Sequence, residues 1–230
     1  MVIMKNKYCV FGIFFLLLAF FVMPVNAALN VKTFKLYNGL EFYLIKTNNP
    51  VITYATWVNA GGIDENNGKQ GVAHFLEHMM FKDNKKYTGT EVTKLLQSTG
   101  GEYNAFTNYD YTVYYETTPF YYLSLVMKLE ASRLQGLSFK EEQFFKERKV
   151  ILEERGLRID NKPIAKFTET MGYYVLPNSN YGRSLIGSTN DIENITINDL
   201  KEFYNTYYVP SNIKIFVIGN ITLKQLKHLA

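Results

Sequence analysis

Hydrophobic and polar residues alternate along residues 31–47, on both sides of an Asn38-Gly39 pair. Alternation with a period of two is typical of a half-buried strand, and Asn-Gly is the strongest short signal for a two-residue hairpin turn. We therefore predict a β-hairpin here. The next run, residues 51–58, has the same character and predicts a third strand.

From residue 71 onward the apolar residues recur at the spacing of a helix. The elements predicted after the third strand are helices at 71–81 and 88–99, strands at 102–109 and 111–118, helices at 119–135 and from a Ser138/Glu141 capping box to about Arg158, helices beginning near Pro163 and at Thr196, a strand at 213–219 and a last helix after it. A hairpin followed by mixed helices and strands predicts an α+β fold, with a largely antiparallel sheet packed against helices.

The first 27 residues have a different pattern from the rest of the chain. Lys5 and Lys7 precede an uncharged apolar run from Tyr8 to Met23, and small residues lead up to Ala27. This pattern predicts a secretory signal peptide, 1–27, cleaved after Ala27. The alternative is an uncleaved membrane anchor, although the run is shorter than the roughly 20 residues that a span needs. The remainder, 28–230, is predicted to be one domain that stops inside its last helix.

Composition narrows the function of this domain. The formal net charge of the chain is +4, two of the positive charges lie in the signal segment, and no basic block follows. Nucleic-acid binding is therefore not expected. The single cysteine, Cys9, also lies in that segment, so a metal bound by residues 28–230 must use nitrogen and oxygen ligands.

Such ligands are available in the segment GVAHFLEHMMF, residues 71–81. His74 and His78 are four positions apart, so both imidazoles lie on one face of the predicted helix. Glu77 flanks the same face, where its carboxylate can accept a proton from a metal-bound water. The alternative is an amphipathic helix that carries two histidines without a metal, and a third ligand would decide between the two.

The long helix after residue 140 offers candidates for that third ligand. Four residues share one stripe of it at about 100° per residue: Glu147, Val150, Ile151 and Glu154. Glu153 points toward solvent instead. An ionised carboxylate beside apolar residues is costly unless it is paired or bound to a metal. Periodicity alone leaves two interpretations of Glu154 open, a metal ligand or an ion-pair partner of Arg158 one turn later.

Three segments carry a family likeness: GGIDENNGKQGVAHFLEHMMFKDNKKYTG, LLQSTGGEYNAFTNYDYTVYYETTP and ERKVILEERGLRIDNKP. They resemble the pitrilysin/insulinase family of zinc peptidases, the inverzincins, and most of all its bacterial, processing-peptidase-like branch. The resemblance runs from about Val31 to the end of the chain and implies one pitrilysin-type half-domain.

The resemblance also implies roles for single residues. His74, His78 and Glu154 would hold one Zn²⁺ per chain, Glu77 would be the general base acting on the zinc-bound water, and Glu147 would be a further carboxylate that orients a histidine. Two departures from the family pattern, Asp83-Asn84 and Asn180, do not touch these residues.

The segment Asn104, Ala105, Phe106 and Thr107 resembles the edge strand with which the family binds an extended peptide. The alternative is an ordinary strand with Phe106 in the core. Because alternate residues of a strand face opposite ways, both interpretations can hold together.

The implied function is that of a periplasmic or secreted zinc endopeptidase that cleaves extended or unfolded polypeptides. Active members of the family consist of two homologous halves around a chamber, so the expected partner is a second homologous domain, a companion subunit or a second copy of this chain. No membrane contact is expected after signal cleavage. The alternative is a non-catalytic homologue acting as a partner subunit, or an inactive fragment of a truncated gene. The complete set of ligands favours the enzyme.

Overall fold

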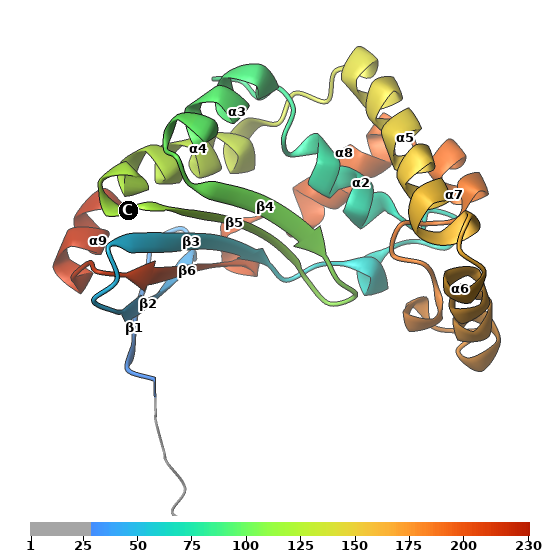
Figure 1. The fold of residues 1–230 in the computed structure, drawn as a ribbon, viewed down its shortest axis with the longest axis horizontal. Coiled ribbons are helices and arrows are strands. Elements are labelled where there is room, and N and C mark those ends of the chain that lie inside the picture. The colour runs from blue at the N-terminus through green and yellow to red at the C-terminus, as the bar shows by residue number, and fades with distance from the viewer. Residues whose placement is uncertain (1–28) are drawn as a thin grey trace, which may run out of the picture. The chain divides into compact units, whose positions relative to one another are not determined.

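A six-stranded sheet organises residues 31–230, which form one compact unit in the computed structural model (Figure 1). Its strands are β1 (Val31–Lys35), β2 (Glu41–Lys46), β3 (Val51–Val58), β4 (Glu102–Thr107), β5 (Thr112–Pro119) and β6 (Ile213–Gly219). They lie in the order β1-β2-β6-β3-β5-β4, and every neighbouring pair is antiparallel except β2 and β6. The prediction of an α+β fold with a largely antiparallel sheet is confirmed.

The structure describes residues 29–230. The predicted signal peptide and its alternative, an uncleaved anchor, fall outside these residues. No helix within the described part is long and apolar enough to cross a bilayer.

The β1–β2 hairpin is present, but its turn differs from the predicted one. The Leu36 carbonyl accepts a hydrogen bond from the Gly39 N–H at 3.0 Å, and Leu36 N–H donates to Leu40 O at 2.8 Å. Gly39 has a φ of 96°, so the loop has three residues, a tight turn followed by a left-handed glycine. The prediction of a two-residue Asn-Gly turn was wrong because both kinds of loop use glycine in that conformation.

One face of the sheet carries most of the core. Along β3 and β6 every second residue is buried, for example Ile52, Val58 and Ile215. Helices α4 (Leu123–Gly136), α3 (Gly89–Ser98) and α2 (Val72–Met79) pack against β3, β4 and β5 (Figure 1). The alternation of the strands therefore fixes on which side the helices lie.

The remaining helices are α5 (Glu141–Arg155), α6 (Pro163–Val175), α7 (Thr189–Asn194), α8 (Ile197–Tyr207) and α9 (Leu223–Leu229). Both α5 and α8 pack on α2. Figure 1 shows α5, α6 and α7 together beyond one end of the sheet. This arrangement brings the middle of the chain against the helix that carries the two histidines.

Helix α5 begins later than its predicted cap. Lys140, rather than Ser138, is the N-cap residue, and the helix starts at Glu141. Between them Phe139 adopts a φ of 41°, and the Ser138 N–H donates to Asp83 O at 2.9 Å. Leu137 pairs with Asn84 in an isolated β-bridge, and the Ser138 N–H is part of that pairing. Ser138 is therefore not free to act as the cap of α5 that the sequence pattern predicted. The α-helix ends at Arg155 and continues as a single π-turn, Gly156–Asp160.

Candidate metal centre

Helix α2 presents the HFLEH segment, and a buried carboxylate holds its first turn. Glu65 accepts hydrogen bonds from the backbone N–H groups of Gly71 at 3.0 Å and Ala73 at 2.9 Å. Burial raises the pKa of Glu65 to about 8. The two N–H donors stabilise its charged form and lower the pKa, but burial has the larger effect. The sequence analysis missed Glu65, because its distance along the chain from the helix matches no capping pattern.

Three side chains from two helices converge at one point. The candidate ligand atoms of His74, His78 and Glu154 all lie within 4.8 Å of one another. Glu154 Oε2 is 3.2 Å from His78 Nε2 and 3.8 Å from His74 Nε2. Since α2 packs on α5, the four-residue spacing of the histidines aims both rings at the same carboxylate.

Glu154 forms the ion pair with Arg158 that one interpretation predicted, and its position is compatible with the other, a metal ligand. Its Oε1 accepts from Arg158 Nε at 2.9 Å, while Oε2 faces the two histidines. The neighbouring Glu153 is exposed, as expected. Val150, expected on the buried stripe, is 41% exposed. That part of the prediction was wrong because α5 buries a narrower stripe than the one assumed.

Glu147 lies behind His78, on the side away from Glu154. Its Oε1 is 2.9 Å from His78 Nδ1, and its Oε2 is 2.5 Å from Lys82 Nζ. A hydrogen on Nδ1 then donates to Glu147, and Nε2, the other ring nitrogen, faces Glu154 and His74.

The protonation of the two histidines differs because their neighbours differ. Burial and the nearby His78 lower the pKa of His74 to about 4. Burial opposes the charge on His78 as well, but Glu147 and Glu154 outweigh it and raise its pKa to about 9. His74 is thus a neutral imidazole, as a metal ligand must be.

These residues fit a zinc ion. Two imidazole nitrogens and one carboxylate oxygen form the usual protein ligand set of a catalytic zinc site. All three converge within a few ångströms, and a carboxylate behind His78 fixes the direction of its ring. Glu153, Lys149 and Arg148 are on other sides of α5 and do not belong to the set.

Glu77 lies between the metal centre and the sheet. It is buried, and its Oε2 accepts a hydrogen bond from Thr107 Oγ1 at 2.5 Å. Burial raises the pKa of Glu77, although the Thr107 hydroxyl stabilises its charged form. A carboxylate with a raised pKa is a better proton acceptor near neutral pH than an exposed one.

Thr107 ends β4, the edge strand of the sheet that the described residues form. Asn104 and Phe106 are exposed, whereas Ala105 and Thr107 are half-buried toward α2. Phe106 is 44% exposed, so the alternative that placed it in the core was wrong. The four residues Asn104 to Thr107 therefore form an accessible strand edge that leads to Glu77.

A cavity of about 460 Å³ adjoins the centre on the side of His74. Its wall includes Thr107 and Tyr109 at the end of the sheet, Ala165 on α6, and Leu185 and Ile186 on the loop before α7. Most of the lining is uncharged, and the charged side chains in it are Arg158, Glu169 and Arg183.

Comparison with known families gives two matches along the chain. Residues 42–187 match the family profile described as Insulinase (Peptidase family M16), and residues 194–230 match the profile described as Peptidase M16 inactive domain. The first match alone covers more than half of the chain and contains His74, Glu77, His78 and Glu154.

Known relatives agree with this assignment. The chain is 34% identical over 214 residues to "Zinc protease PqqE" of Helicobacter pylori, covering 90% of this chain and 46% of that protein. The crystal structure of a protease from Helicobacter pylori has a TM-score of 0.80 at 33% identity, over 87% of this chain and 49% of that one. The periplasmic protease PqqL from Escherichia coli has a TM-score of 0.79 at 28% identity, over 86% of this chain and 23% of that one.

The chain thus spans about half the length of the curated relative it matches, or less. The relatives are zinc proteases, and the resemblance noted from the sequence motifs is confirmed. The profile match and the identity to PqqE lead to one conclusion: the chain belongs to the insulinase family of peptidases, family M16.

Proposed function

We propose that this chain is the metal-binding half of a zinc endopeptidase that hydrolyses extended or unfolded polypeptides in the periplasm or outside the cell. The observation that carries the proposal is the convergence of His74, His78 and Glu154 beside a buried Glu77 and an accessible strand edge. A non-catalytic homologue would not need to keep this whole set in place.

We assign one zinc ion per chain to His74, His78 and Glu154, with Glu147 orienting His78. Zinc bound there would supply Lewis acidity to the attacking water and to the peptide carbonyl. Glu77 takes the proton of that water at Oε1, the oxygen that Thr107 does not engage. The same atom then delivers the proton to the departing amine nitrogen.

The substrate strand is β4. One side of β4 pairs with β5, and its other side is the edge of the described sheet. An extended peptide can pair with that edge through its backbone, which gives affinity without strict dependence on sequence. Residues Asn104 to Thr107 then place the peptide backbone next to Glu77 and the histidines.

The partner that we propose is a second homologous half, supplied by a further domain, a companion subunit or another copy of the chain, because the chain spans only about half of its relatives. The periplasmic assignment rests on the pattern of residues 1–27 and on the periplasmic relative PqqL.

Metal analysis and one substitution test the proposal. Purified residues 28–230 are expected to bind one zinc ion per chain, and Glu77→Gln is expected to abolish hydrolysis of an unfolded protein substrate while zinc stays bound. The matched control is Glu153→Gln on the exposed side of α5, which should change neither zinc content nor rate. Absence of stoichiometric zinc, or full activity of Glu77→Gln, would overturn the mechanism.

A further inference from the structure

Helix α6 forms the outer wall of the cavity beside His74, yet little hydrophobic burial holds it there. Within residues 29–230, no side chain of α6 is buried. Ile164 is 82% exposed and Phe167 is 65% exposed, whereas Ala165, Thr168 and Gly172 line the cavity. Because apolar burial is the main force that docks a helix, another interaction must fix the position of α6.

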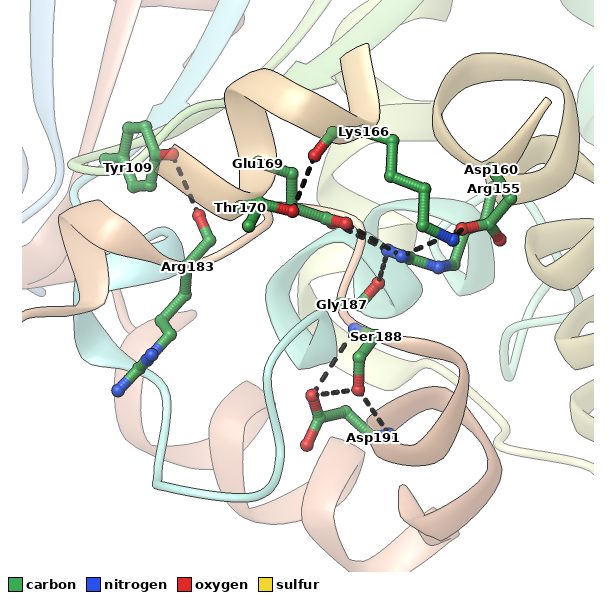
Figure 2. A network of polar contacts seen from close by, with 10 residues as sticks. All are labelled: Tyr109, Arg155, Asp160, Lys166, Glu169, Thr170, Arg183, Gly187, Ser188 and Asp191. Carbon is green, nitrogen blue, oxygen red and sulfur yellow. Dashed lines mark hydrogen bonds and ion pairs between the residues drawn. The ribbon is translucent and has the colours of Figure 1, made fainter. Parts of the chain in front are cut away.

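Several contacts hold α6, among them Arg183 over the ring of Tyr173 at 4.0 Å, and the guanidinium of Arg155 makes the two-pronged one (Figure 2). Arg155 Nη1 and Nη2 donate to the two carboxylate oxygens of Glu169, on α6, at 2.8 and 2.9 Å. Nη2 also donates to Asp160 Oδ1 at 3.1 Å, in the π-turn before α6. The Arg155 side chain is only 6% exposed, and a two-pronged pair of this kind is among the stronger polar contacts in proteins.

The same guanidinium also holds the loop between α6 and α7. Arg155 Nη1 donates to the Gly187 carbonyl at 2.5 Å. Gly187 has a φ of +82°, and a Cβ at this position would lie 2.1 Å from Gln70 O. The loop thus lies directly against Gln70, the residue before the N-cap of α2. One side chain therefore joins α5, α6 and the loop before α7 (Figure 2).

Arg155 follows Glu154 directly, but its contacts are with Asp160, Glu169 and Gly187 rather than with the metal centre. Removing the guanidinium should release the cavity wall and leave the ligand atoms in place. Burial raises the pKa of Glu169, but the hydrogen bonds from Arg155 and Ser184 outweigh it and hold that pKa below its usual value. Glu169 is thus ionised as the partner of Arg155.

We propose that Arg155 is a positioning residue for the substrate: through Glu169 and Gly187 it holds α6 as the wall of the cavity beside His74, and it thereby sets peptide binding rather than metal binding. The part that concerns peptide hydrolysis rests on the proposed function. The part that concerns α6 stands on the contacts alone.

The test uses the zinc-loaded chain, residues 28–230, and two variants. Glu169→Gln keeps the shape of a half-buried side chain and removes its charge. Arg155→Lys keeps the positive charge but replaces the two-pronged guanidinium with a single ammonium group. In both, hydrogen exchange of residues 163–175 should be about tenfold faster or more, with α2 and the first turns of α5 unchanged. KM for an unfolded protein substrate should rise about tenfold, while kcat changes less than about twofold.

Matched controls separate the outcomes. Glu153→Gln removes a charge from the exposed side of α5 and should alter neither exchange nor KM. Unchanged exchange of α6 in both variants would overturn the proposal, as would loss of zinc in proportion to activity, since Arg155 would then support the metal centre. If the unmodified chain binds no stoichiometric zinc, the proposed function fails, whereas the exchange measurement still decides the role of Arg155.

Discussion

Glu147 is the residue that joins the candidate metal centre to the rest of α5. It lies between His78 and Lys82, and both of its oxygens are engaged. A carboxylate behind a ligating histidine fixes the ring and raises the basicity of the ligand nitrogen. We therefore expect Glu147→Gln to weaken zinc binding by about 10–100-fold, measured by competition with a chelator.

The control for this prediction is Glu142→Gln, an exposed glutamate of the same helix, which should leave zinc affinity unchanged. Equal affinity of Glu147→Gln and the unmodified chain would show that the contact with His78 does not orient a ligand.

Thr107 controls the charge of Glu77. Its hydroxyl donates to Glu77 Oε2 and stabilises the carboxylate, so it works against the rise in pKa that burial causes. In Thr107→Val the donor is lost and the pKa of Glu77 rises further. Since only the ionised form can accept a proton, the acid limb of the kcat–pH profile should move to higher pH. An unmoved acid limb, with zinc content unchanged, would assign the proton acceptor to another group.

At the residue scale, local spacing predicted which side chains of one helix face the same way. It did not predict the residues from other elements that hold the helices in position. The four-residue spacing of His74 and His78 needs only a helix, so it could be interpreted without a structure. Glu65 and Arg155 contact residues that depend on how α2, α5 and α6 pack together. No periodicity encodes such contacts.

At the element scale, Asp83 ties the starts of two helices together. Its Oδ1 accepts from Gly89 N–H, in the first turn of α3, at 2.8 Å. Its Oδ2 accepts from Lys140, the N-cap residue of α5, at 2.6 Å. Asp83, which departs from the family pattern, therefore makes contacts that link α3 and α5.

The pH dependence of stability should report this tie. Hydrogen bonding to Lys140 lowers the pKa of Asp83 to about 2, below the roughly 3.9 of an unfolded aspartate. Its contribution is therefore fully present above pH 4 and is lost as the pH falls toward 2. Asp83→Asn should have a lower urea midpoint at pH 6, and the gap should narrow steadily as the pH falls from 4 toward 2. A gap that stays constant with pH would assign the stabilisation to shape alone.

The elements themselves were largely predictable, and their ends were not. Alternation identified the strands, and the helix predicted over 88–99 is present, with a capping box formed by Thr88 and Glu91. The hairpin turn and the start of α5 differed because Gly39 and Ser138 fit more than one local pattern, and contacts distant in the sequence chose among them.

At the scale of the whole molecule, the order of the strands depends on the end of the chain. Strand β6 lies between β2 and β3, and its Ile215 and Val217 are fully buried. Sequence patterns predicted a buried strand there but not its neighbours, because pairing between strands about 160 residues apart leaves no local signal. The sheet thus joins segments that match two different family profiles.

This arrangement predicts that residues 29–193 do not form a stable domain on their own. Without β6, strands β2 and β3 lose their shared neighbour, and without α8 the helix that carries His74 and His78 loses one of its packing partners. The shortened chain should lack a cooperative unfolding transition by near-UV circular dichroism and should not bind stoichiometric zinc. Adding residues 194–230 back as a separate peptide should restore both, because the sheet needs the strand rather than its covalent connection. A cooperatively folded, zinc-binding 29–193 would show that the boundary between the two profiles is also a boundary between folding units.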